Sequence, residues 1–177
     1  MGGAPVHLAR LFLFSAFAIT LTVITTLSVR AEPQPPQTHG AWSVECKPRA
    51  GSPENICVAS QVVAVGEAGK QAVLGVMVAP TQGEALPHII FRFSPGANLK
   101  AGVGVKIDQQ EAFRVPISQC DNHICEVRSL MPEELLAQMR VGRMLQFAYF
   151  LEKQQLTYPV SLNGFDAAYA ALHKPPE

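Results

Sequence analysis

The residues best suited to chemistry are four cysteines, at positions 46, 57, 120 and 125. The segment Cys120-Asp-Asn-His-Ile-Cys125 could pass for a metal site, with His123 as a third ligand. A structural zinc site needs four ligands, usually in closely spaced pairs, and the other histidines show no such spacing. The C-x4-C spacing also differs from the C-x-x-C of thiol oxidoreductases. A disulfide is therefore the favoured interpretation, and no metal or cofactor is predicted.

The N-terminal segment indicates the redox compartment of these cysteines. Residues 1–10 form a short, positively charged segment, and residues 11–29 form an apolar one. Val29-Arg30-Ala31 then places small residues at the −3 and −1 positions of a cleavage site. This pattern predicts a signal peptide over 1–31, a proline-rich linker over 32–39 and a folded domain over 40–173. We expect a periplasmic or secreted protein. An inner-membrane anchor is the alternative, because nineteen apolar residues can just span a bilayer.

An even number of cysteines in an exported protein predicts disulfides. Three pairings are possible. The local pairing, Cys46 with Cys57 and Cys120 with Cys125, is favoured because each pair encloses a turn-forming loop. A crossed pairing from Cys46 to Cys120 or Cys125 stays open, since β-sandwiches can carry bridges between sheets.

Patterns for catalysis are weak, and no catalytic residue is predicted. Ser161 stands in Pro-Val-Ser-Leu, without the glycine elbow of a serine hydrolase. Gly102-Val-Gly104 has no helix after it, so a bulged strand is favoured over a phosphate loop. Several acidic residues fall on predicted turns or helix starts, where exposure to solvent or interaction with a helix dipole explains them without a catalytic role. They are Glu67, Asp108, Glu133 and Glu134. Trp42, the single tryptophan, is predicted to pack in the core against the nearby disulfide rather than to bind a ligand.

The charge balance excludes two classes of partner. Arg10 and Arg30 lie in the leader and all 14 acidic residues lie beyond it, so the remainder carries 12 basic and 14 acidic residues, a net charge of −2. Nucleic-acid binding and polybasic membrane-surface binding both need a basic patch. The expected partner is therefore an envelope or host protein, with membrane contact only through an uncleaved leader.

The elements that must position these residues are mostly short β-strands. Two helices are also predicted, one from Pro132 to Gly142 with Gly142 as a left-handed cap, and one from Gly164 to Leu172 with Asn163 as N-cap. Nine strands at close spacing predict an antiparallel β-sandwich. They cover residues 41–46, 56–65, 72–78, 89–93, 103–107, 112–117, 125–128, 144–151 and 157–161.

The order of several motifs resembles the invasion-associated locus B family of exported bacterial proteins. The resemblance covers residues 40–172 and rests on Trp42-Ser-Val-Glu-Cys46, Cys57, Pro95-Gly96, Val105-Lys-Ile107-Asp108, Phe113-Arg114, the two later cysteines and the closing stretch from Pro159 to Ala168. It implies an immunoglobulin-like β-sandwich, export and local disulfides at the four cysteines. It implies no known enzymatic activity, and some family members are linked to host-cell invasion.

Two functional hypotheses follow. The first is a non-enzymatic exported envelope protein, an invasion-associated binding or accessory factor that aids host-cell entry. The second is a periplasmic hydrolase whose acidic residues meet only in the fold. An enzyme predicts a deep cleft lined by at least two titratable groups, whereas a binding protein predicts an exposed apolar or aromatic patch.

Overall fold

A computed structural model describes residues 1–3, 35–48 and 55–173. Residues 4–31 of the predicted signal peptide, residues 32–34 of the predicted linker and residues 49–54 of the loop between Cys46 and Cys57 lie outside the described residues. Among the residues described, no helix has the length and apolar character needed to cross a bilayer.

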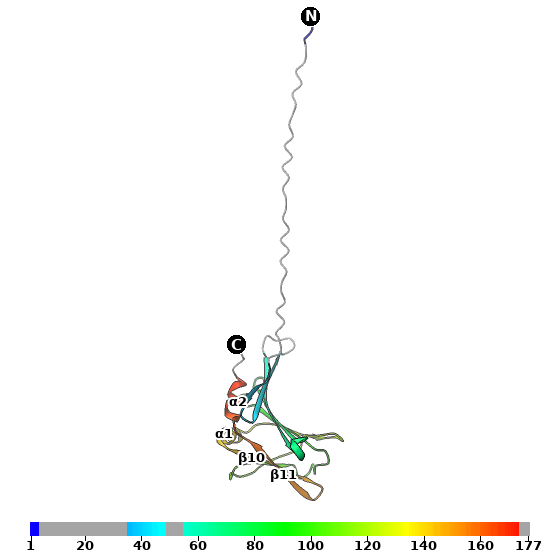
Figure 1. Cartoon of the computed structure of the whole chain (residues 1–177), viewed down its shortest axis with the longest axis vertical. Helices are drawn as coiled ribbons and strands as arrows, with labels where there is room; N and C mark the ends of the chain where they lie inside the picture. Colours follow the sequence, from blue (N-terminus) through cyan, green and yellow to red (C-terminus); the bar gives the residue numbers. More distant parts are fainter. Residues whose placement is uncertain (4–34, 49–54, 174–177) are drawn as a thin grey trace. The chain divides into compact units, whose positions relative to one another are not determined.

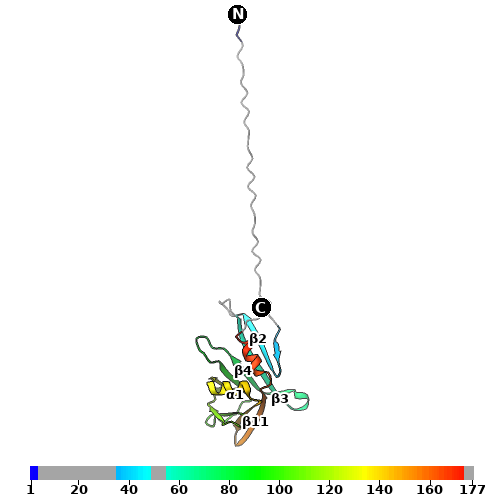
Figure 2. The same cartoon turned by 90° about the vertical axis from the view of Figure 1, so that its left-hand side faces the viewer.

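The described part of the domain is built from two antiparallel sheets (Figures 1 and 2). One sheet has seven strands in the order β1-β2-β3-β4-β5-β9-β8, and the other has four in the order β11-β10-β6-β7. The predicted mostly β sandwich with two short helices and disulfides is thus confirmed, in an open form. The strands are β1 (Gln37–His39), β2 (Trp42–Pro48), β3 (Asn55–Val65), β4 (Gln71–Ala79), β5 (His88–Phe93), β6 (Val103–Ile107), β7 (Phe113–Val115), β8 (Gln119–Cys120), β9 (Cys125–Leu130), β10 (Met144–Leu151) and β11 (Gln154–Ser161).

An aromatic cluster joins the two sheets. Phe91 of β5 stacks on Phe147 of β10, with ring centroids 4.8 Å apart. Phe93 contacts both Phe147 and Tyr149, at 5.1 and 4.7 Å. These side chains are almost fully buried, because alternate residues of β5 and β10 point into the core. The alternation leaves the opposite side chains of β10 on the outer face of the four-stranded sheet.

Two helices pack on the domain, α1 (Glu133–Val141) and α2 (Phe165–Ala171), with the turn η1 (Glu67–Gly69) elsewhere in the chain. They contact each other, and α2 also contacts β1 and β2 (Figure 2). The apolar face of α1 is buried as predicted and consists of Leu135, Leu136 and Met139. Glu133 and Glu134 occupy its first turn, where their carboxylates interact favourably with the positive end of the helix dipole.

The buried face of α1 predicts a large cost for truncating Leu135, which is only 1% exposed. Leu135→Ala is expected to lower the free energy of unfolding by about 2–5 kcal/mol, because it leaves a cavity in the core. Val141→Ala is the matched control on the same helix, since Val141 is 86% exposed. Urea unfolding followed by circular dichroism gives both values. A loss below about 0.5 kcal/mol for Leu135→Ala would place that face at the surface.

Three local predictions differ from the structure at turns. Residues 37–39, predicted as linker, form β1, because the two-residue turn at Gly40 and Ala41 returns the chain onto β2. The N-cap of α2 is Gly164 rather than Asn163. Gly142 is extended rather than left-handed. A glycine is needed at this position because there is no room for a side chain: a Cβ there would lie 2.5 Å from Cγ2 of Ile107.

Candidate functional site

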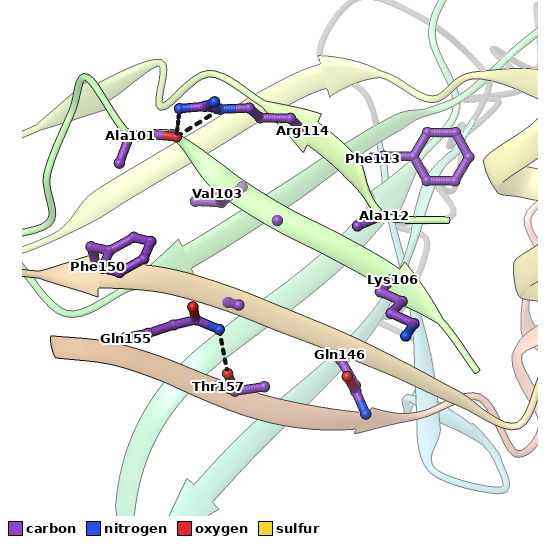
Figure 3. A pocket seen from close by; sticks show the side chains of 13 residues that line it. Ala101, Val103, Lys106, Ala112, Phe113, Arg114, Gln146, Phe150, Gln155 and Thr157 are labelled. Atoms are coloured by element: carbon purple, nitrogen blue, oxygen red, sulfur yellow. Dashed lines mark hydrogen bonds between the residues drawn. The ribbon is translucent and has the colours of Figure 1, made fainter. Parts of the chain in front are cut away.

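A groove of about 430 Å³ lies on the outer face of the four-stranded sheet (Figure 3). Strands β6, β10 and β11 supply its floor, and the segment that includes β7 forms one side. Its volume falls within the range of small-molecule sites in proteins. The lining residues are Ala101, Gly102, Val103, Gly104, Lys106, Ala112, Phe113, Arg114, Gln146, Ala148, Phe150, Gln155 and Thr157.

The floor is hollow because small residues meet at its centre. The strand register places Ala148 beside Gly104 on one side and beside Thr157 on the other. Gly104 is in turn paired with Arg114 across β6 and β7. A Cβ added at Gly104 would meet no atom within 4 Å, so this glycine contributes open space to the groove.

Aromatic, amide and cationic groups surround this floor. Phe150 is 39% exposed, and Gln155 donates to the hydroxyl of Thr157 at 3.4 Å. Figure 3 shows Phe150 and Lys106 at opposite ends of the groove. Among the described residues that line it, Lys106 and Arg114 carry the only charges, and both are positive.

The guanidinium of Arg114 is fixed by backbone contacts. Its Nε and Nη2 donate to the carbonyl of Ala101 at 2.9 and 2.6 Å (Figure 3). This leaves Nη1 for another acceptor. A second hollow of about 270 Å³ shares Ala101, Gly102 and Arg114 with the groove and adds Lys100 to its wall.

The four cysteines lie in two disulfides away from this groove. Cys46 is bonded to Cys57 and Cys120 to Cys125, and each pair joins directly opposed residues of adjacent strands. This is the local pairing. The Cys120–Cys125 bond consumes both sulfurs that a metal at His123 would need. The turn is held by Asp121, whose Oδ1 accepts from the backbone N–H groups of His123 and Ile124.

Two other residues considered for catalysis, Ser161 and Asp108, accept hydrogen bonds from backbone N–H groups and so have structural roles. Ser161 Oγ accepts from the N–H of Asn163 at 3.3 Å. Asp108 accepts from the N–H groups of Arg143 and Met144, which fixes the start of β10. Gly102 is not in a bulged strand as predicted: it precedes β6 with a positive φ, and a Cβ there would lie 2.7 Å from the carbonyl oxygen of Val115.

Trp42 belongs to the core as predicted, although its aromatic partner is on a helix. The side chain is fully buried, and its ring meets Phe165 of α2 edge to face at 4.9 Å. Its Nε1 donates to the carbonyl of Ser161 at 2.9 Å. The indole therefore ties β2 to α2 and to the end of β11.

Glu126 is a buried acid that the sequence analysis did not single out. Arg92 donates to its Oε2 at 2.8 Å and Arg128 to its Oε1 at 3.1 Å. The hydrogen bond from Arg92, followed by that from Arg128, holds the pKa of this carboxyl below its usual range. A carboxyl with a lowered pKa stays ionised and is poorly suited to act as a general acid. Its role here is to link β5 and β9 on the outer face of the seven-stranded sheet.

The lowered pKa of Glu126 predicts a pH-dependent contribution to stability. A depressed native pKa stabilises the fold above the unfolded-state pKa, and this contribution is lost as pH falls through the native pKa. Glu126→Gln is expected to cost about 1–2 kcal/mol at neutral pH and much less in acid. Urea unfolding across the acid range measures this, with Glu45→Gln as control because the Glu45–Lys47 pair is exposed. An equal cost at both pH values would contradict the assignment.

The comparisons with known proteins agree with this fold. The family model described as invasion associated locus B (IalB) protein matches residues 42–173. The chain belongs to this family. A crystal structure of invasion associated protein B from Bartonella henselae matches with a TM-score of 0.67 and 20% sequence identity, covering 78% of this chain and 95% of that chain. No match was found among curated proteins. The likeness to the Bartonella structure supports the fold of this locus B family member.

The sequence of this family member did not indicate the groove, although Gly102, Gly104 and the Phe113-Arg114 motif, which line it, were noted for other reasons. Alternation along β10 could have indicated that Gln146, Ala148 and Phe150 share its outer face. It could not show that Gly104 lies beside Ala148, because that contact depends on the pairing of β6 with β10.

Proposed function

We propose that this protein is a non-enzymatic, exported binding factor of the bacterial envelope that aids host-cell entry, with the groove over the four-stranded sheet as its binding surface. It would act in the periplasm or after secretion, on an envelope or host-surface partner. Membership of the locus B family supports a role associated with invasion.

One observation carries the binding hypothesis. The groove has an exposed aromatic ring, amides and two cations, and the described residues that line it include no carboxylate, histidine or cysteine. The hydrolase considered from the sequence would need acidic side chains that meet at the substrate. The arrangement therefore suits recognition better than hydrolysis, the alternative considered from the sequence.

The test fills the groove and leaves the fold intact. Gly104→Leu projects a side chain into open space, because a Cβ there meets no atom within 4 Å. Gly75→Leu is the matched control on the outer face of the other sheet, where a Cβ would make only ordinary contacts, at 3.9 Å or more. Labelled full-chain protein is titrated onto envelope fractions and onto host cells, and the bound fraction is measured.

We expect saturable binding that Gly104→Leu weakens about tenfold, while Gly75→Leu binds like the wild type. The proposal fails if no surface is bound saturably. It also fails if Gly104→Leu and the wild type bind equally well.

A further inference from the structure

At its centre, over β6 and β10, the floor of the groove offers a ligand side chains but little free backbone. Strand β6 is paired on both sides, with β10 and β7, and β10 is paired with β6 and β11. Most of the N–H and C=O groups at the centre of these two strands are therefore used within the sheet. A bound peptide must satisfy its own backbone polar groups, and peptide-binding sheets do this at an edge rather than on a face. The groove thus favours a ligand whose polar groups are hydroxyls and acids.

The neutral lining matches the chemistry of a sugar. Gln146, Gln155 and Thr157 each provide a donor and an acceptor, as a hydroxyl group requires. The half-exposed ring of Phe150 offers an apolar surface for the C–H face of a pyranose.

The charged lining specifies an acidic sugar. Lys106 and Arg114 lie in the groove, and Lys100 lines the hollow that adjoins it at Arg114. Arg114 keeps Nη1 available after binding the carbonyl of Ala101. Arginine and lysine both bind carboxylates through charge-assisted hydrogen bonds.

The site is long enough for several sugar units. Lys106 is paired with Gln146, and Phe150 lies four residues further along β10, which is roughly 13 Å of strand. The second hollow extends the surface past Arg114 toward Lys100. We infer that the groove binds an oligosaccharide that contains uronic acids, with Lys106 and Arg114 on its carboxylates and Phe150 against a sugar face. This inference rests on the proposed binding role of the groove.

The experiment titrates the full-length protein with uronic-acid oligosaccharides by calorimetry, using hyaluronan, oligogalacturonate and oligomannuronate fragments. Each is compared with its carboxyl-reduced, neutral counterpart, and poly-glutamate serves as an acidic peptide. We expect at least one fragment to bind about tenfold more tightly than its neutral form. Lys106→Gln and Gly104→Leu should both weaken that binding about tenfold. The control variants Lys70→Gln and Gly75→Leu should not weaken it.

Three outcomes overturn the inference. They are equal binding of each acidic fragment and its neutral form, poly-glutamate binding as tightly as the best fragment, and binding that Gly104→Leu leaves unchanged. Competition separates this inference from the proposed function. If cell-surface binding depends on Gly104 but the best oligosaccharide does not displace it, the saccharide inference fails and the proposed function stands. If the oligosaccharide binds but no cell or envelope surface does, the proposed function fails instead.

Discussion

Replacing Gly164 by alanine is expected to lower the free energy of unfolding by about 3 kcal/mol or more. Gly164 has a φ of 85°, a backbone angle that residues other than glycine rarely adopt. The added Cβ would lie 2.1 Å from the carbonyl oxygen of His39 and 2.9 Å from the nitrogen of Gly40. Both atoms belong to the β1–β2 hairpin, and backbone cannot move aside as a flexible side chain can.

The same contact is tight from the other side. A Cβ at Gly40 would lie 2.5 Å from the carbonyl oxygen of Asn163, and that oxygen accepts from the N–H of Ala41 at 3.0 Å. The first hairpin and the start of α2 are thus joined backbone to backbone. Gly164→Ala should separate them, and hydrogen exchange should show faster exchange in β1 and in α2.

Gly83→Ala provides the matched control for Gly164→Ala. Gly83 also has a positive φ, 81°, but a Cβ there would meet no atom within 4 Å. Its substitution should therefore cost only the conformational strain, about 1 kcal/mol. Urea unfolding of the two variants separates strain from steric overlap. Equal losses would mean that the β1–β2 hairpin does not press on Gly164.

The strands that the sequence predicted best are those with strong apolar or β-branched runs. Strand β10 was predicted with the bounds that the structure gives, because residues 144–151 form an apolar and aromatic run with one polar residue, Gln146. Strands β1 and β8 were missed because they have only three and two residues. Elements so short are defined by their partners rather than by their own pattern.

The division of strands between the two sheets could not be read from the sequence. Alternation specifies which side chains face the core, but it does not say which strands are neighbours. Strand β9 pairs with β5 although three other strands lie between them in the chain, and β10 pairs with β6. The groove follows from this second pairing, since it places Gly104 beside Ala148. The candidate site was therefore out of reach for sequence reasoning even where the strands were right.

The sequence placed acids at turns and helix starts correctly but did not show their distant partners. Asp108 follows β6, as predicted for a turn residue, yet its carboxylate accepts from the backbone N–H groups of Arg143 and Met144, 35 and 36 positions away. Glu126 lies within a strand, and Arg92, its first partner, is 34 positions away. A glutamate at an interior strand position two residues before an arginine was the available signal. It indicates a possible ion pair, but not that the carboxyl is buried.

Trp42→Ala is expected to lower the free energy of unfolding by about 3–5 kcal/mol, the range for removing a large buried aromatic. Trp42 is fully buried, so its removal leaves a cavity between β2 and α2. It also deprives the carbonyl of Ser161 of the indole donor, although Gln61 Nε2 still donates to that oxygen at 2.9 Å. The loss should therefore come mainly from packing against Phe165.

Two further variants test that division of the energy. Trp42→Phe keeps an aromatic ring against Phe165 but removes the Nε1 donor, so it should cost clearly less than Trp42→Ala. Phe150→Ala removes a half-exposed aromatic from the outer face and should cost less than about 1 kcal/mol. Unfolding in urea is followed by circular dichroism, because Trp42 is the only tryptophan and its variants lose that fluorescence. If Trp42→Ala costs no more than Phe150→Ala, the indole is not part of the core, and α2 is held to the sheet chiefly by the Gly164 junction.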